Sequence, residues 1–327
     1  MKNVKIRGIE VYRPENFIHI DDIISEFEKK GKDIEVLAKE FFGKEIIHIS
    51  KDNKENSLTM AIEAAKKVLT TTKLEGKDID MIVLSSMLPE YVSPPSAMLI
   101  HKAINGKSNT LCYDINVNCI GMTVAMNQIC KQITNDKNIN RVLLIGSDYN
   151  RIHVEEDNEN MLSNLGDAAC AIILEKTDEE CGLIDSEYFI DTSTIDTVAM
   201  PRCGSSHIHE VDKKELRSKM QATPGDIAVV IEHIKNMLER NDLTINDISM
   251  CCFSQAVLFI IEQIREELSI PEEKSIYIGN KYGYTGTSSP FIALYEAIKE
   301  KRVKRGDNIL FWTAGAQLQY VFAIMKY

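Results

Sequence analysis

The sequence has no long apolar stretch. Its first residues, MKNVKIRGIEVY, alternate charged and apolar side chains, whereas a secretory signal peptide needs a continuous apolar core. The most apolar later stretch, residues 251–261, is interrupted by Ser254 and Gln255 and is too short to cross a bilayer. We therefore expect a cytoplasmic protein that has no membrane partner.

The sequence also lacks the spacings that bind structural metals. It has eight cysteines, but no two of them form a C-x-x-C pair, and no histidine stands at a zinc-ligand spacing from them. No G-x-G-x-x-G motif follows the first apolar stretch, which argues against a dinucleotide-binding oxidoreductase. We therefore expect no metal and no resident cofactor.

Positive charge is scarce as well. Asp and Glu number 49 against 38 Lys and Arg, which gives a net charge of −11. Nucleic-acid binding requires clustered Lys and Arg side chains that neutralise phosphates. The one basic run, residues 299–305, coincides with a predicted helix end, where cations suit the helix dipole. We expect no nucleic-acid partner.

Two segments share one plan. Residues 57–91 predict a helix opened by Ser57, then a turn and the strand IDMIVLSS. Residues 226–256 predict the same order, with a helix opened by Asp226 and the strand ISMCCFS. The chain is also long enough for two such units. The two halves therefore look like copies of one another.

Near-continuous apolar strands recur in both halves, at residues 141–150, 166–176 and 307–325. Because such strands alternate with amphipathic helices, the sheets they form are expected to be covered on both faces. We predict an α/β protein with a layered α/β/α/β/α fold built from two duplicated halves, residues 1–175 and 176–327.

Cys119 stands where a predicted strand gives way to a helix, in the stretch DINVNCIGM (114–122). The helix predicted over 119–133 is apolar nearly all round, as a helix buried between sheets would be. A cysteine at this junction has two interpretations. It is a small buried hydrophobe, as most cysteines are, or a nucleophile whose pKa is lowered by the helix N-terminus.

Five stretches that follow one another along the whole chain carry a family resemblance. They are residues 114–122, 164–174, 253–261, 281–298 and 314–327. In this order and spacing they resemble the β-ketoacyl-ACP synthase III family of the thiolase superfamily. The resemblance implies a thiolase-like fold and an acyltransferase that forms an acyl thioester on Cys119. It also implies that the N–H groups of Cys119 and of the Gly315–Ala316 turn stabilise the oxyanion.

The resemblance further implies partners. Acyl-CoA or another acyl thioester would supply the acyl group, and acyl carrier protein would carry the group with which it is condensed. The product would belong to fatty-acid or specialised lipid or polyketide biosynthesis. The family forms homodimers, and we expect a homodimer here.

The chain departs from the family at four positions. Ser254 and Tyr284 replace the catalytic histidine and asparagine, which donate hydrogen bonds to the malonyl thioester. In the substrate pocket, Phe259 replaces an arginine, and Pro94 replaces the aromatic residue that closes the acyl pocket of the partner subunit. Losing one donor of this kind typically costs ~10²–10³ in rate, so decarboxylative condensation stays an open question.

Two functions remain open from the sequence. In the first, the chain is an acyltransferase that transfers or condenses an acyl group held on Cys119. In the second, it is a catalytically impaired thiolase-fold subunit that forms a heterodimer with an active paralogue. An alternative base would come from His207 or His209, which lie in the irregular segment 191–223.

Overall fold

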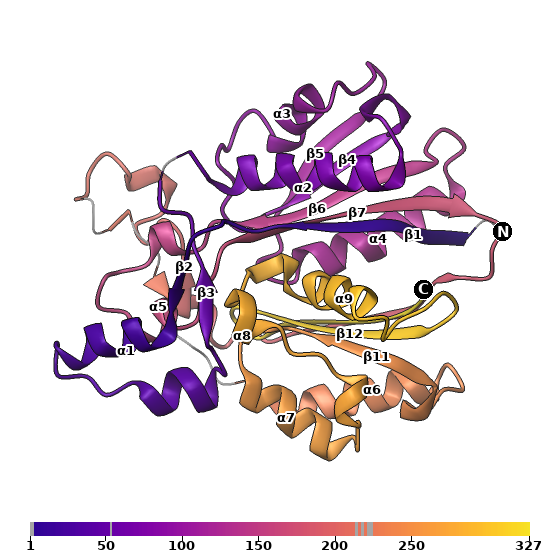
Figure 1. The fold of residues 1–327 in the computed structure, drawn as a ribbon. Helices are drawn as coiled ribbons and strands as arrows, with labels where there is room; N and C mark the ends of the chain where they lie inside the picture. The colour runs from indigo at the N-terminus through magenta and orange to yellow at the C-terminus, as the bar shows by residue number, and fades with distance from the viewer. Residues whose placement is uncertain (1–2, 53, 213–214, 217–218, 221–224) are drawn as a thin grey trace.

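The structure is a computed structural model, and it describes residues 3–52, 54–212, 215–216, 219–220 and 225–327. Two sheets alternate with three layers of helices (Figure 1). From the top of Figure 1 these layers are α2 with α3, the first sheet, α4 with α9, the second sheet, and α6 with α7. The predicted α/β/α/β/α fold is confirmed.

The first sheet has the strand order β1-β7-β6-β4-β5. Strand β4 is parallel to β5 and β6, whereas β7 is antiparallel to β1 and β6. Strand β5 is therefore left at the edge with one side unpaired. The strands are β1 (Asn3–Tyr12), β4 (Met81–Ser85), β5 (Leu111–Ile115), β6 (Arg141–Asp148) and β7 (Ala168–Thr177).

The second sheet has the order β11-β12-β13-β8. The apolar stretch at 307–325 forms a hairpin of β12 and β13, whose turn has positive φ at Gln317 and Leu318. All four strands follow the first sheet along the chain, while the domain boundary at residue 175 stays a prediction. The strands are β8 (Gly182–Ile190), β11 (Ile248–Phe253), β12 (Asn308–Gly315) and β13 (Gln319–Lys326).

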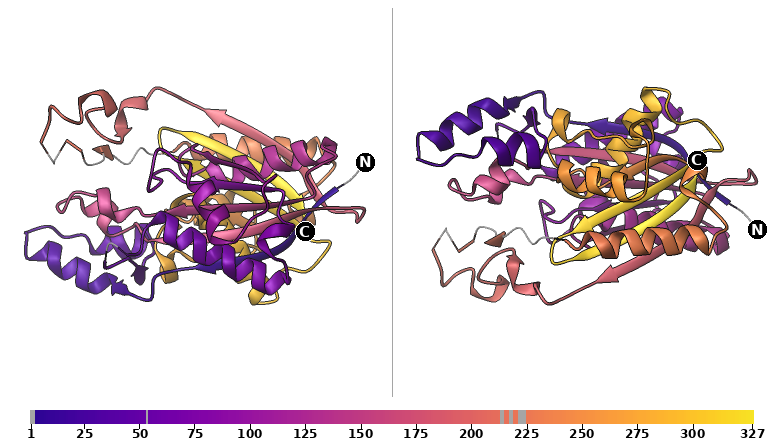
Figure 2. Two further views of the ribbon diagram at one scale, coloured as in Figure 1. Left: turned by 90° about the horizontal axis from the view of Figure 1, so that it is seen from above. Right: turned by 90° about the horizontal axis from the view of Figure 1, so that it is seen from below.

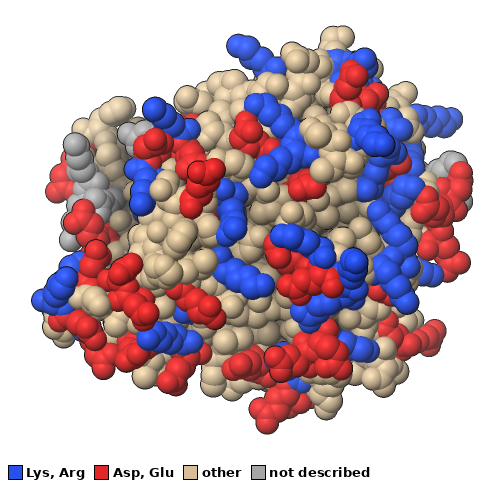
Figure 3. Space-filling view, viewed as in Figure 1, with Lys and Arg blue, Asp and Glu red and all other residues tan. Residues whose placement is uncertain are grey.

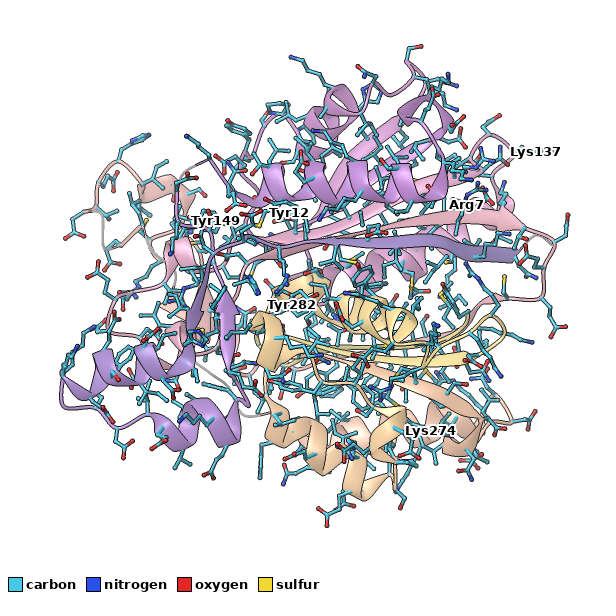
Figure 4. All side chains as sticks on the ribbon, viewed as in Figure 1. Arg7, Tyr12, Lys137, Tyr149, Lys274 and Tyr282 are labelled. Atoms are coloured by element: carbon cyan, nitrogen blue, oxygen red, sulfur yellow. The ribbon has the colours of Figure 1, made fainter. Side chains whose placement is uncertain are left out.

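Helices α4 (Gly121–Asn135) and α9 (Ser289–Lys299) form the middle layer. They share one apolar core with the inner faces of both sheets, and side chains fill the space between the layers (Figure 4). Met122, Met126 and Ile129 of α4 are completely buried, at the spacing that keeps them on one face. The buried helix predicted at 119–133 is thus present, and it begins two residues after Cys119.

The outer helices are α2 (Ser57–Thr72), α3 (Ser96–Ala103), α6 (Ile227–Glu239) and α7 (Leu258–Glu267). The predicted start of α6 is confirmed, since the Asp226 side chain accepts a hydrogen bond from the Ala228 N–H at 2.9 Å. Helix α2 begins at Ser57, as predicted, but its capping residue is the one before. Asn56 caps this helix through the N–H of Thr59 at 3.0 Å, while the Ser57 hydroxyl donates to the Leu88 carbonyl.

Short elements gather at one end of the layered body, opposite the two termini (Figures 1 and 2). None of the described helices is long and apolar enough to cross a bilayer. In the described part of the segment predicted to be irregular, the only strands are two of two residues each. The elements at this end are β2 (Phe17–His19), α1 (Ile20–Glu28), the π-helix η1 (Val36–Phe41), β3 (Ile46–His48), α5 (Glu159–Leu162), β9 (Val198–Ala199) and β10 (Lys219–Met220).

Candidate active site

A cavity of about 390 Å³ opens at this end of the molecule. Its walls are mostly apolar and come from η1, the start of α6, the start of α7 and the β12–β13 hairpin. Five of the predicted site residues line it together: Cys119, Ser254, Tyr284, Gly315 and Ala316. The structure therefore brings residues from four distant parts of the sequence to one place.

Cys119 occupies the turn that leads into α4. Asn118, directly before it, has a positive φ of 51°, a conformation that Asn tolerates better than most residues. Gly121 starts the helix, and a Cβ there would lie 2.3 Å from the Ser85 hydroxyl oxygen. A glycine two residues after the cysteine is thus required for α4 to pack against the end of β4.

Three donors lie close enough to the Cys119 sulfur to lower the pKa of its thiol. They are its own backbone N–H, the backbone N–H of Ala316 and the hydroxyl of Tyr284. The two N–H groups are those that the resemblance implies for the oxyanion. Gln317 holds the Ala316 turn in place, because its side-chain amide donates to the Val198 carbonyl at 2.6 Å and accepts from the Asn118 amide at 3.4 Å.

Burial raises the pKa of the Cys119 thiol to about 11, and the nearby Asp148 carboxylate adds to this shift. The three nearby donors oppose the shift but do not reverse it. Two N–H groups at the start of α4 are already used, since Met122 donates to the Thr287 hydroxyl at 2.6 Å and Gly121 to the Asn118 carbonyl at 3.1 Å. Of the two interpretations of Cys119, the one in which the helix N-terminus lowers the thiol pKa does not fit this structure, and the resting group is a thiol.

Tyr284 lies between Cys119 and Ser254. Its backbone is fixed by the 164–166 segment, through N–H···O bonds of 2.8 Å to Asn164 and 2.9 Å from Gly166. Burial raises the pKa of its hydroxyl well above 10, so the side chain is a neutral phenol at any physiological pH. It is therefore a hydrogen-bond donor to the sulfur and not a base.

The Ser254 hydroxyl is buried next to Tyr284. Its oxygen meets no described group in hydrogen-bond geometry, yet it is close enough to the Tyr284 hydroxyl to lower the pKa of that group. The Ser254 backbone is fixed by an N–H···O bond of 2.8 Å to Trp312 on the neighbouring strand. Two neutral hydroxyls thus stand beside the thiol.

Asp148, at the end of β6, connects the loops around the site. One carboxylate oxygen accepts from the Met87 N–H at 2.8 Å, and the other accepts from the Thr287 N–H at 2.9 Å. Burial raises its pKa to about 6, so it remains ionised at neutral pH. Gly286 has a φ of 62°, and a Cβ there would lie 2.3 Å from this carboxylate. The loop that carries Tyr284 is held in this way against β6.

Lys44 is a buried residue that the sequence analysis missed. It is 1% exposed, and its ammonium group donates to the carbonyls of Gln255 and Ala256 at 2.9 and 3.3 Å and to the Tyr277 hydroxyl at 2.7 Å. Burial lowers its pKa well below 10.5. The hydrogen bonds from Lys44 to these carbonyls therefore anchor the turn after Ser254. Two adjacent charges, Lys44 and Glu45, within the otherwise apolar run FFGKEII were the available signal.

Other predicted candidates lie outside the cavity. Pro94 is exposed, and Phe259 is 43% exposed beside the opening, so neither lines the cavity within one chain. His207 is exposed and bonds to Glu210, and neither His207 nor His209 lines the cavity. Among the residues that the structure describes, no three His, Cys, Asp or Glu side chains are grouped as a metal site.

Comparisons with known proteins define the class as thiolase-fold enzymes. The family model described as 3-oxoacyl-[acyl-carrier-protein (ACP)] synthase III matches residues 113–192, and its C-terminal counterpart matches residues 238–327. A β-ketoacyl-[acyl-carrier-protein] synthase III of Clostridium perfringens is 28% identical over the whole of both chains. The chain belongs to the 3-oxoacyl-ACP synthase III family, and the predicted family is confirmed.

Solved structures agree with this assignment. The 3-oxoacyl-[acyl-carrier-protein] synthase III of Aquifex aeolicus superposes with a TM-score of 0.85 and 26% identity, over 99% of this chain and 100% of that one. The priming β-ketosynthase of the R1128 polyketide pathway has a TM-score of 0.87 at 19% identity, covering 99% and 96% of the two chains. The second likeness concerns the fold alone.

The raised pKa of Cys119 predicts a steep pH dependence of its reactivity. At pH 7 a thiol with a pKa of about 11 is ionised in only about one molecule in ten thousand. Because the thiolate is the reactive form, alkylation by an uncharged reagent should accelerate about tenfold per pH unit between pH 7 and pH 10. Peptide masses identify Cys119 among the eight cysteines. Tyr284→Phe should slow alkylation at each pH, and a plateau below pH 9 would contradict the assignment.

Replacing Lys44 should loosen the turn after Ser254. Lys44→Met leaves two buried carbonyls and the Tyr277 hydroxyl without their donor, so the free energy of unfolding should fall by about 2 to 4 kcal/mol. Urea unfolding measures this change. Lys39→Met is the matched control, since this lysine is 40% exposed and should change stability little. Equal stability of the two variants would show that Lys44 does not anchor the turn.

Proposed function

We propose that the chain is an acyltransferase that accepts an acyl group from a thioester onto Cys119 and then transfers or condenses it. The single observation that carries this proposal is the position of the Cys119 sulfur, at an apolar cavity and facing the N–H groups of Cys119 and Ala316. The products would serve fatty-acid or specialised lipid or polyketide biosynthesis, in the cytoplasm.

In the first step the sulfur of Cys119 attacks the thioester carbonyl carbon. A new C–S bond forms, and the carbonyl oxygen becomes an oxyanion that the two N–H groups stabilise. The bond from this carbon to the carrier sulfur then breaks. The proton given up by Cys119 ends on the departing carrier sulfur, which leaves as a thiol. Until then the Tyr284 hydroxyl, beside the Cys119 sulfur, is suited to stabilise the negative charge on that sulfur by donating a hydrogen bond.

In the second step Ser254 and Tyr284 would replace the usual pair of donors. Decarboxylation of a malonyl thioester leaves an enolate, whose oxygen needs hydrogen-bond donors and no base. Two neutral hydroxyls beside Cys119 can supply such donors, with acyl carrier protein presenting the malonyl group. The high pKa of the thiol and the absence of a histidine among the described lining residues favour the second candidate, an impaired subunit paired with an active paralogue.

Mass spectrometry separates these functions. The protein is incubated with a panel of acyl-CoA and acyl-ACP thioesters, and the peptide that holds Cys119 is weighed. An acyl adduct that is absent in Cys119→Ala supports the acyltransferase, and its loss on adding malonyl-ACP, with a β-ketoacyl product, supports condensation. The absence of an adduct with every donor would refute the acyltransferase and favour the impaired subunit.

We also propose that the chain forms a homodimer through the open edge of β5. Apolar side chains are exposed on this strand, just before α3 and within it, with Leu111 46%, Val92 98% and Met98 52% exposed. An unpaired edge with exposed apolar neighbours is suited to strand pairing between two copies. Such pairing would also bring Pro94 near the partner subunit.

Sedimentation velocity tests this assembly. The wild-type protein should sediment at twice the chain mass of 37.0 kDa, and Leu111→Asp should shift it to the monomer, because a buried unpaired carboxylate opposes association. Ile184→Asp on β8 is a matched control with a similarly exposed apolar residue. A wild-type monomer at micromolar concentration would refute the proposed homodimer.

A further inference from the structure

The opening of the cavity can be located from the exposure of its lining. Most lining residues are buried or half-buried, and three are exposed: Phe41, Gly225 and Asp226. These residues belong to the end of η1 and to the start of α6. The donor thioester must therefore enter between these two elements, and its carrier end must remain outside them.

Two aromatic side chains stand together beside this opening. Phe41 and Phe259 are 38% and 43% exposed, and their ring centroids are 5.7 Å apart with an angle of 31° between the planes. Phe259 comes from α7, between the lining residues Val257 and Ile260. The rim of the opening is thus apolar where the carrier end of a donor would pass.

The elements that carry this pair are rich in carboxylates. Their two cations are already paired, Lys39 with Asp21 and Glu35 at 2.9 and 3.0 Å, and Arg265 with Glu272 at 3.8 Å. In Figure 3, Asp and Glu side chains gather along the lower edge of the molecule, over α1 and α7. Five glutamates stand on η1, directly before it and on α7: Glu35, Glu40, Glu262, Glu266 and Glu267.

The cavity wall continues this pattern. Among the lining residues that the structure describes, Asp226 is the only charged one, and it stands at the opening. Lys44 is buried and makes three hydrogen bonds to neutral groups, so it does not reach the opening. A phosphate placed at the described part of the rim would thus meet aromatic rings and carboxylates. The carboxylates would repel the phosphate, because like charges in partly desolvated surroundings repel.

We propose that the opening selects acyl donors by the charge of their carrier end, disfavouring the several phosphates of coenzyme A and accepting a carrier end with less negative charge. The proposal rests on the proposed function, because it concerns the donor that acylates Cys119. Phe41 and Phe259 with Glu262, one helical turn further along α7, are the specificity-determining residues. A donor arm that suits them is apolar and carries less negative charge than coenzyme A.

The test compares one acyl group on two carriers. Acyl-pantetheine and acyl-CoA share the same reacting end and differ in the charged nucleotide. The second-order rate constant for acylation of Cys119 is measured by peptide mass with each donor. At about 20 mM salt we expect acyl-pantetheine to react about tenfold faster, which corresponds to about 1.4 kcal/mol. Raising salt to about 300 mM should narrow this ratio, because the Debye length falls below about 10 Å.

Reversing the charge of Glu262 tests whether this residue causes the preference for acyl-pantetheine over acyl-CoA. Glu262→Lys should raise the rate with acyl-CoA relative to acyl-pantetheine and weaken the dependence of the ratio on salt. The control is Glu63→Lys, on α2 at the opposite outer layer (Figure 1), where the glutamate side chain is 45% exposed and pairs with Lys66. This control should leave the ratio of the two rates unchanged.

The outcomes are distinguishable. If neither donor acylates Cys119, the proposed function fails and this inference fails with it. If acyl-CoA reacts as fast as acyl-pantetheine at low salt, or if Glu262→Lys and Glu63→Lys change the ratio equally, the opening does not select by charge. In either of those cases the acyltransferase function stands and the inference is overturned.

Discussion

Burial of α4 between the two sheets is the constraint on which the site depends. The helix can lie there only because its faces are apolar and because Gly121 lets its first turn approach β4. This placement puts Cys119 on the wall of an apolar cavity, where it is half-buried. The same burial that positions the sulfur also makes its ionisation costly. Position and weak acidity of the thiol therefore have one cause.

The layered fold could be predicted from the sequence because strand and helix patterns are local. Residues 226–256 show this well, since the cap at Asp226 and the strand after it follow from periodicity and side-chain type. The capping residue of α2 was mispredicted by one position because Asn56 and Ser57 are both good caps. Only the hydrogen bond from the Ser57 hydroxyl to the Leu88 carbonyl decides between them.

The candidate site was predictable only in part. Motif order located Cys119, Ser254, Tyr284 and the Gly315–Ala316 turn, and these residues line one cavity. The direction in which the Cys119 thiol pKa shifts was not predictable. It depends on burial and on which N–H groups are already bonded, and both are tertiary properties. Lys44 escaped notice for the same reason. Its three acceptors, at Gln255, Ala256 and Tyr277, are more than 200 residues away in the sequence.

The Gln317 side chain has a consequence beyond fixing a turn. It joins the Val198 carbonyl, on the cavity wall, to the hairpin that aims the Ala316 N–H at the sulfur. Two of the residues in this hairpin hold positive φ values that a non-glycine residue adopts at a cost, so the turn keeps its shape only while this link persists. The cavity wall and the oxyanion donor are thus mechanically coupled. A ligand that displaces Val198 also moves the Ala316 N–H relative to the Cys119 sulfur.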